Sequence, residues 1–248
     1  MEADFWLDKW TRNEIGFHED RVHPLLQKYW RAVVDAHKPH LDLAAGNDNP
    51  LADKQAHDGQ IEDSQANKAS GTNVFVPLCG KSLDLLWLAD CGHHVYGVEL
   101  SEIAVESLFT ENDLEFERTS EDLFTKYSGE HCGKNITIWC GDYFSLTPSM
   151  LPTIHLFYDR AAFIALSPQT RSDYLDALAR LLGTNAYGLM VTLEYVDGLI
   201  TPPPHSITPP KVKNICSTNF LVETLGRGDS EVKGKPCTEH ALLMQTIG

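Results

Sequence analysis

From residue 74 onward, short apolar runs alternate with segments of helical spacing, and this alternation restricts the fold more than any other feature of the sequence. Strands that alternate with helices form a mostly parallel sheet with helices on both faces. We therefore expect a doubly wound α/β sheet of seven strands, with an antiparallel hairpin at one edge. The expected strands cover residues 74–77, 94–99, 136–140, 154–158, 186–194, 219–225 and 241–247.

The residues before this core divide into two segments. Pro24 begins a pattern in which apolar residues recur every three or four positions, which predicts a helix. Residues 38–73 are rich in Asp, Asn, Gln, Ala and Gly and poor in aromatic and β-branched residues, so we expect a mobile surface insertion or linker. The predicted organisation is one domain overall, with a helical N-terminal lid (1–37), the insertion (38–73) and the core (74–248).

Composition excludes several classes of partner. The net charge of −15 argues against binding to a nucleic acid backbone, because such binding depends on Lys and Arg neutralising phosphates. Six cysteines without a CxxC pair are expected to be reduced thiols, and no apolar run approaches the length of a membrane span. We expect a cytoplasmic protein with no nucleic acid partner, no membrane contact and no metal. Nothing in the sequence indicates an obligate partner, so a monomer is expected.

The segment PLCGKS, residues 77–82, ends like a phosphate-binding loop. The first glycine of such a loop would fall at Phe75, inside the first expected strand, and the loop itself is too short to wrap a phosphate with its amides. The apolar run 154–158 that ends at Asp159 resembles the second motif of these hydrolases. The absent glycine nevertheless argues against a nucleoside triphosphate, and the GxGxxG pattern of dinucleotide binding is also absent.

Polar residues follow several expected strands, and ligands of such sheets bind beyond the carboxyl ends of the strands. Glu99 ends the second strand about 20 residues after the first turn, the interval expected for a carboxylate that binds a ribose diol. Asp142 and Tyr143 follow the third strand and are positioned to meet an adenine through an amide, a carboxylate or a ring face. A ribose-binding acid without a phosphate loop indicates a nucleoside without phosphates, and S-adenosylmethionine fits this description.

Together these stretches resemble the thiopurine S-methyltransferase family of class I S-adenosylmethionine-dependent methyltransferases. The resemblance covers nearly the whole chain outside residues 38–73 and rests on the following segments: FWLDKW and NEIGFHEDRVHPLL within 5–26, VFVPLCGKSLDLLWLADCGHHVYGVELSEIAV at 74–105, GDYFSL at 141–146, YDRAAFIAL at 158–166, and LEYVDG with PPPHSI within 193–207. It implies a Rossmann-like methyltransferase sheet with an N-terminal helical extension. Two features differ from the family: the insertion is longer, and PPPHSI replaces a GPPF-type loop.

The resemblance also implies roles for individual residues. Trp10 is expected to lie over the cofactor, and Leu78 to present its backbone to the amino-acid end of the cofactor. Glu99 is expected to hold the ribose, with Asp142 and Tyr143 at the adenine. For the remaining two residues, the resemblance implies that Arg160 lies where cofactor and substrate meet and that Phe17 forms part of the wall of the acceptor pocket.

The implied reaction is methyl transfer to the sulfur of an aromatic or heterocyclic thiol such as a thiopurine. Such transfer needs in-line positioning and exclusion of water more than acid–base catalysis. We expect Arg160 to favour the thiolate and Asp159 to orient the acceptor through water. Three alternatives remain open from sequence: methylation of selenium or tellurium oxyanions or another small nucleophile, binding of an adenosyl ligand without turnover, and phosphate-loop nucleotide hydrolysis.

Overall fold

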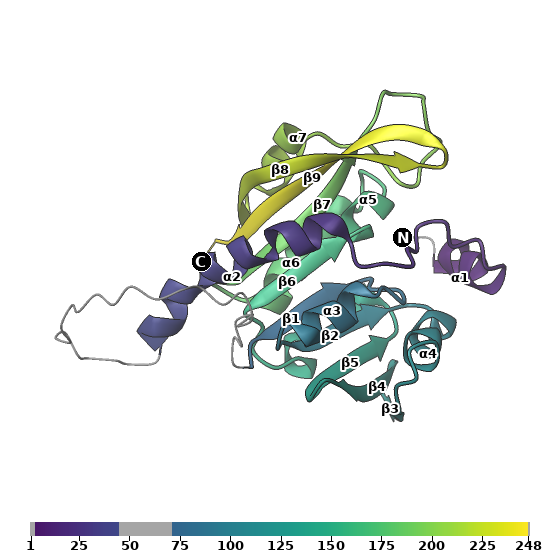
Figure 1. The fold of residues 1–248 in the computed structure, drawn as a ribbon, viewed down its shortest axis with the longest axis vertical. Helices are drawn as coiled ribbons and strands as arrows, with labels where there is room; N and C mark the ends of the chain where they lie inside the picture. The colour runs from purple at the N-terminus through teal and green to yellow at the C-terminus, as the bar shows by residue number, and fades with distance from the viewer. Residues whose placement is uncertain (1–2, 45–70, 248) are drawn as a thin grey trace, which may run out of the picture.

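The computed structural model describes residues 3–44 and 71–247, and in it one twisted sheet has helices packed on both faces (Figure 1). Within these ranges the sheet has nine strands in the order β3-β4-β5-β2-β1-β6-β7-β9-β8. The strands are β1 (Asn73–Pro77), β2 (His94–Glu99), β3 (Phe116–Glu121), β4 (Phe124–His131), β5 (Lys134–Cys140), β6 (Leu156–Arg160), β7 (Tyr187–Glu194), β8 (Phe220–Val232) and β9 (Lys235–Thr246).

The central strands are parallel and the edges are antiparallel. Strands β5, β2, β1, β6 and β7 pair in parallel, whereas β3-β4 flank one edge and β9-β8 the other in antiparallel pairing. The chain passes from β1 to β2 on one side and later to β6 on the other side of β1. The order of strands therefore reverses at β1, and the carboxyl ends of β1 and β6 are where a ligand site is expected in such a sheet.

The predicted fold class is confirmed, but the predicted number of strands is wrong. All seven expected strands are present, including the C-terminal edge hairpin, which is longer than expected. The additional β3-β4 hairpin was not predicted, because β3 is almost entirely exposed and its sequence FERTSE has no apolar run or alternation. A strand at a sheet edge can be held by pairing with its neighbour alone, so its sequence need not carry a burial pattern.

The helices divide between the two faces of the sheet. A core on one face joins the strands to α2, α3 and α4, and a core on the other face joins them to α6 and α7. This is the double winding expected from the alternation of strands and helices. The α-helices are α1 (Ala3–Thr11), α2 (Pro24–Ala44), α3 (Asp84–Asp90), α4 (Glu102–Thr110), α5 (Ala162–Ala165), α6 (Arg171–Leu182) and α7 (Pro209–Cys216), and the short 3-10 helices are η1 (Tyr143–Ser145) and η2 (Pro148–Met150).

The two N-terminal helices lie in different places. Helix α1 lies beyond the carboxyl ends of the parallel strands, and α2 packs along one face of the sheet (Figure 1). Helix α2 begins at Pro24, as predicted, and buries Leu26, Trp30 and Val33. It continues to Ala44, so the first residues of the expected insertion are helical, and residues 45–70 lie outside the described part of the chain.

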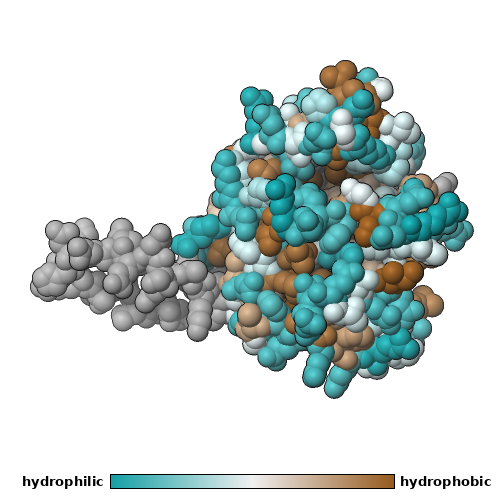
Figure 2. All heavy atoms as spheres, turned by 45° about the vertical axis from the view of Figure 1, so that its right-hand side comes forward, coloured by the Kyte–Doolittle hydropathy of each residue, from teal (hydrophilic) through white to brown (hydrophobic). Residues whose placement is uncertain are grey.

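The state of the cysteines and the distribution of hydrophobic residues on the surface are ordinary for a globular protein. All six cysteines are free, as predicted. Among the described residues, no helix has both the length and the apolar character that crossing a membrane requires. On the face shown in Figure 2, hydrophobic residues form small groups separated by hydrophilic ones, as is usual for a face in contact with water.

Candidate functional site

A cavity of about 790 Å³ opens beyond the carboxyl ends of β1 and β6. This volume is within the range of roughly 300–1,000 Å³ that small-molecule sites occupy. Segments far apart in the sequence line the cavity: part of the N-terminal segment, the β1–α3 turn, the ends of β2 and β6, strand β7, residues 201–204 and the tip of the β8-β9 hairpin. Of the predicted site residues, Trp10, Phe17, Leu78, Glu99 and Arg160 all line it.

The backbone is strained where β1 and β6 end. Leu78 has a φ of 46° directly after β1, and Ala161 has a φ of 64° directly after β6. Residues with a side chain rarely adopt this left-handed conformation, which costs of the order of 1 kcal/mol or more. Both residues line the cavity. Strain at two neighbouring strand ends around one cavity is typical of a functional site, where the chain is bent to approach a ligand.

Glu99 lies at the junction of two turns. Its carboxylate accepts hydrogen bonds from the backbone N–H groups of Gly80, at 2.9 Å, and Ser101, at 2.8 Å. The side chain is buried, which raises the pKa of the carboxyl group, while the hydrogen bonds from the backbone act in the opposite direction. Each carboxylate oxygen has a second lone pair, so Glu99 can still accept hydrogen bonds from the hydroxyl groups of a ligand.

The β1–α3 turn cannot act as a phosphate loop. The amide of Gly80, which would face a phosphate, donates to the carboxylate of Glu99, and the amide of Cys79 donates to the carbonyl of Val98 at 3.0 Å. A carboxylate already occupies the position of the anion and would repel a phosphate. The structure thus supports the argument from sequence against a nucleotide hydrolase.

The two residues expected at an adenine do not line the cavity. The carboxylate of Asp142 accepts from the amide of Phe144 and the hydroxyl of Ser145, and so caps η1. Tyr143 is buried, its hydroxyl donates to the carbonyl of Tyr174, and the two rings lie 4.9 Å apart. The ring of Tyr143 thus packs against Tyr174 in the core, and contact of Asp142 and Tyr143 with an adenine stays a prediction.

Aromatic side chains from the N-terminal segment cover one side of the cavity. The ring of Trp10, which is 7% exposed, lies against the backbone of Gly80, at 3.4 Å from the position that a Cβ atom would take there. Phe17 contacts both Trp6 and Trp10 edge-on, with ring centroids 5.6 and 5.5 Å apart. Trp6, Trp10 and Phe17 thus form one aromatic group beside the β1–α3 turn.

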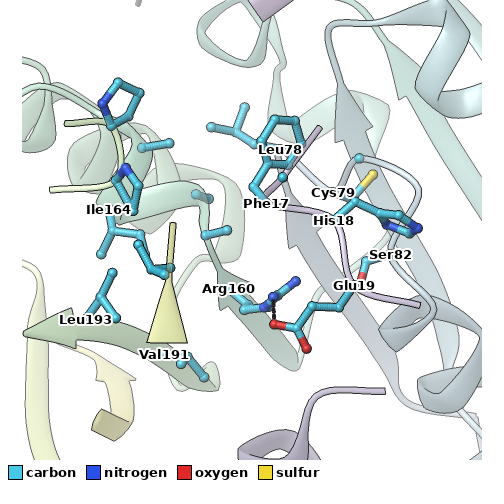
Figure 3. Close-up of a pocket in the computed structure, with 18 of the residues that line it drawn as sticks. Phe17, His18, Glu19, Leu78, Cys79, Ser82, Arg160, Ile164, Val191 and Leu193 are labelled. Atoms are coloured by element: carbon cyan, nitrogen blue, oxygen red, sulfur yellow. Dashed lines mark hydrogen bonds and ion pairs between the residues drawn. The ribbon is translucent and has the colours of Figure 1, made fainter. Parts of the chain in front are cut away.

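Arg160 and Asp159, adjacent at the end of β6, point in opposite directions. The guanidinium of Arg160 lies in the cavity and forms an ion pair with Glu19 (Figure 3). Asp159 is fully buried on the other side and accepts from the hydroxyl of Tyr174, at 2.7 Å, and the amide of Phe163, at 3.1 Å. Burial raises the pKa of Asp159 to about 6. The carboxylate of Asp159 thus bonds within the core, and its expected role in orienting the acceptor through water stays a prediction.

Apolar residues form the wall of the cavity beyond Arg160. Ile164, Val191 and Leu193 lie on the side of Arg160 that faces away from Leu78 and Phe17 (Figure 3). Their side chains are nearly buried, and the cavity continues to Pro202, Pro203 and Pro204 of the loop after β7. We call this part, formed by Ile164, Val191, Leu193 and the three prolines, the apolar lobe. This lobe was not predicted, since the sequence of a strand that is buried along nearly its whole length, such as β7, does not reveal which of its residues meet a cavity.

The other cationic side chains of the cavity wall are already engaged or exposed. Lys81 bonds both carboxylate oxygens of Glu111, at 2.7 and 2.8 Å, and Lys9 pairs with Glu14. Lys233 donates to backbone carbonyls of the loop after β7, and Arg21 is mostly exposed. Arg160, at the end of β6, also has a carboxylate partner, Glu19, and its side chain is 14% exposed.

Cys79 lines the cavity without the properties of a nucleophile. Its thiol is buried, and this burial, reinforced by the charge of Glu99, raises the pKa of Cys79 well above its ordinary value. The thiol therefore stays protonated near neutral pH. Cys79 is thus a free, protonated thiol of the β1–α3 turn.

Comparisons with known proteins agree with this geometry. The sequence profile of the family described as thiopurine S-methyltransferase (TPMT) matches residues 1–42 and 60–242. A thiopurine S-methyltransferase of Pseudomonas syringae pv. pisi is 37% identical over 93% of this chain and 88% of the relative, and one of Pseudomonas putida KT2440 is 41% identical over 84% and 79%. The crystal structure of magnesium protoporphyrin IX methyltransferase from Synechocystis PCC 6803 has a TM-score of 0.53, at 14% identity over 98% and 97% of the two chains, which supports the fold.

Proposed function

This chain belongs to the thiopurine S-methyltransferase family, and we propose how its cavity carries out the reaction. The protein is an S-adenosylmethionine-dependent methyltransferase that acts on the sulfur of aromatic or heterocyclic thiols such as thiopurines. The proposed roles rest on one observation: the buried carboxylate of Glu99, the guanidinium of Arg160 and the apolar lobe all line the same cavity.

The side of the cavity formed by β1 and β2 is proposed to hold S-adenosylmethionine. Glu99 accepts hydrogen bonds from the two ribose hydroxyls with the lone pairs that the backbone amides leave free. The strained backbone at Leu78 brings the β1–α3 turn close to the amino-acid end, and Trp10 covers the cofactor from the N-terminal side. Asp142 and Tyr143 follow β5, which pairs with β2, and are proposed to lie at the adenine beside the cavity rather than in its wall.

The apolar lobe is proposed to hold the ring of the acceptor. Ile164, Val191 and Leu193 offer a hydrophobic surface that suits an aromatic or heterocyclic ring and gives no hydrogen bonds to a small oxyanion. This composition favours a thiol over the selenium and tellurium oxyanions that the sequence left open. Phe17 closes the opposite wall of this part of the site.

When bound, S-adenosylmethionine supplies a methyl group on a positively charged sulfur, and the acceptor sulfur bonds to the methyl carbon as the old bond breaks and leaves its electron pair on the donor sulfur. The protein positions the two reactants and excludes water. Arg160 stabilises the thiolate form of the acceptor from the boundary between the two halves of the cavity. The thiol proton passes to solvent when the thiolate forms.

We also propose the setting in which the protein acts. Residues 1–37 serve as a lid whose aromatic side chains close over the cofactor, with Trp10 and Phe17 in support.

The protein works in the cytoplasm as a monomer and without a nucleic acid partner. Six free cysteines and a net charge of −15 support this part of the proposal.

The activity is tested by incubating the protein with methyl-labelled S-adenosylmethionine and 6-mercaptopurine and separating the products. We expect label in an S-methyl product, and none when hypoxanthine, which carries oxygen in place of the sulfur, is the acceptor. Absence of labelled S-methyl product across the pH range in which the protein stays folded would contradict the proposed function.

A further inference from the structure

Glu19 is the counter-ion of the cation that we place beside the reacting sulfur. One carboxylate oxygen of Glu19 bonds the Nη2 atom of Arg160, and the two side chains are 31% and 14% exposed (Figure 3). Glu19 belongs to the loop between α1 and α2, two residues after Phe17, and it lines the same cavity. An acceptor thiolate in the apolar lobe therefore shares Arg160 with a carboxylate from the lid.

Among the described residues, Glu19 is the carboxylate that forms an ion pair with Arg160. The exposed guanidinium of Arg21 lies 3.9 Å from the second oxygen of Glu19, where solvent screens it. Arg160 contributes to the pKa shifts of His18 in the same loop and of Tyr158 in β6, in each case less than burial does. Burial lowers the pKa of His18 and raises the pKa of Tyr158 well above its ordinary value, so both side chains are neutral near pH 7 to 9.

The charged groups farther from Arg160 are paired or hydrogen-bonded with other residues. The hydroxyl of Tyr158 donates to Asp84, whose second oxygen accepts from the amide of His23. His23 in turn faces Glu239 of β9 at 3.2 Å. Lys81, on the α3 side, is held by Glu111. Glu19 is thus the carboxylate that directly offsets Arg160 among the described residues.

We propose that Glu19 is a positioning residue that limits how strongly Arg160 stabilises the acceptor thiolate, an inference that rests on the proposed function. A cation in contact with a thiolate lowers the pKa of that thiol, and a carboxylate bound to the same cation reduces this effect. Without the carboxylate, the guanidinium would hold the thiolate more tightly and would also repel the positive sulfonium of the donor. Glu19 therefore couples closure of the lid to the charge that the acceptor meets.

Removal of the charge of Glu19 should change the pKa of the bound acceptor thiol. When Glu19 is replaced by glutamine, the volume and one hydrogen-bond acceptor are kept and only the negative charge is lost. Arg160 then acts on the acceptor with its full charge, and the pKa of the bound thiol falls by roughly half a unit to one unit. In a plot of kcat against pH, the rise on the acid side moves to lower pH by the same amount. The corresponding rise of kcat/KM does not move, since kcat/KM reports the ionisation of the free thiol and the free enzyme.

The test uses the complex of the full chain with S-adenosylhomocysteine and 6-mercaptopurine, in which no transfer occurs. The ultraviolet spectrum of the thiopurine, which changes on ionisation, gives the pKa of the bound acceptor. We expect a midpoint lower by half a unit to one unit in Glu19→Gln and in Glu19→Ala, and a wild-type midpoint in Glu19→Asp, which keeps the carboxylate. Asp20→Asn removes the same charge from the neighbouring exposed residue and should shift the midpoint by less than about 0.2 units.

The outcomes separate the inference from the proposed function. If 6-mercaptopurine binds the wild-type complex but its midpoint is the same in Glu19→Gln and Glu19→Ala, Glu19 only anchors the lid and the inference is overturned. An equal shift in Asp20→Asn would overturn it too, because the effect would then not pass through Arg160. If the wild-type complex does not bind the thiopurine at all, the proposed function itself fails, and this inference with it.

Discussion

Replacing Glu99 by alanine should weaken cofactor binding and stability together, by amounts that follow from its contacts. The carboxylate accepts hydrogen bonds from the amides of Gly80 and Ser101. Ser101 is buried, so its orphaned N–H costs about 1–3 kcal/mol, whereas water in the cavity can reach the N–H of Gly80. Removal of a buried charge, whose pKa is raised by burial, offsets part of this loss. We expect the free energy of unfolding to fall by about 1–2 kcal/mol.

The effect of Glu99→Ala on the cofactor is expected to be larger than its effect on stability. A hydrogen bond to a charged group contributes about 1.5–3 kcal/mol, so loss of the contact with the ribose should raise the Kd by roughly 10- to 150-fold. Isothermal titration calorimetry with S-adenosylhomocysteine measures this directly, at a temperature at which the variant is folded. Glu117→Ala, a change at an exposed glutamate of the edge strand β3, is the matched control and should leave Kd unchanged. A Kd of Glu99→Ala within about twofold of the wild type would refute the reasoning, since 1.5 kcal/mol is already about tenfold.

Three further changes test other parts of the site. Arg160→Lys keeps the charge but loses the planar fork, so the single-turnover rate of methyl transfer should fall roughly 10- to 100-fold while cofactor affinity changes little; an unchanged rate would place Arg160 outside the reaction. Trp10→Ala uncovers the backbone of Gly80 and should raise the Kd for S-adenosylhomocysteine by about tenfold or more in calorimetry, and an equal Kd would show that α1 does not cover the cofactor. Asp159 has a pKa raised from 3.8 to about 6, so its contribution to stability is complete below pH 4 and is lost as the pH rises through 6, by about 3 kcal/mol at most. Asp159→Asn, which cannot ionise, should remove this fall in the free energy of unfolding between pH 4 and pH 7 in urea titrations, and an equal fall in both proteins would contradict it.

The order of elements was predictable because buried strands and helices carry their own patterns. Each of the five central strands contains a short run of mostly apolar, buried residues, and Gly or Pro marks several of the turns between strands and helices. The β3-β4 hairpin was missed since the exposed strand β3 is polar and pairs at the edge of the sheet without an apolar face. Placement at an edge is a property of the assembled sheet, and no local window of sequence contains it.

Part of the site was predictable for a similar reason. Leu78, Glu99 and Arg160 lie at or just after the carboxyl ends of strands that must meet at one edge of the sheet, and the structure brings them to one cavity. The direction in which a side chain points was not predictable, and this separates Arg160 in the cavity from Asp159 in the core. Neighbouring residues at a strand end face opposite sides, but the sequence does not say which side holds the ligand.

Contacts between segments that are distant in the sequence could not be predicted from the sequence. The pair formed by Glu19 and Arg160 joins residues 141 positions apart, and neither has a neighbour in sequence that signals the other. Tyr143 shows the reverse case, because its position after β5 suggested a ligand contact, whereas its ring packs on Tyr174 of α6. In both cases, the packing of a helix or loop against a strand end decides the role of the side chain.

The central claim is that the cavity between β1, β2, β6 and β7 holds both reactants, with the cofactor at Glu99 and the thiol in the apolar lobe. A crystal structure of the protein with S-adenosylhomocysteine and 6-mercaptopurine tests it most directly. The account predicts both ribose hydroxyls within hydrogen-bond distance of Glu99, and the purine ring against Ile164 and Leu193 with its sulfur between Arg160 and the cofactor sulfur. An adenosyl group bound away from Glu99, or a thiopurine bound outside the apolar lobe, would contradict it.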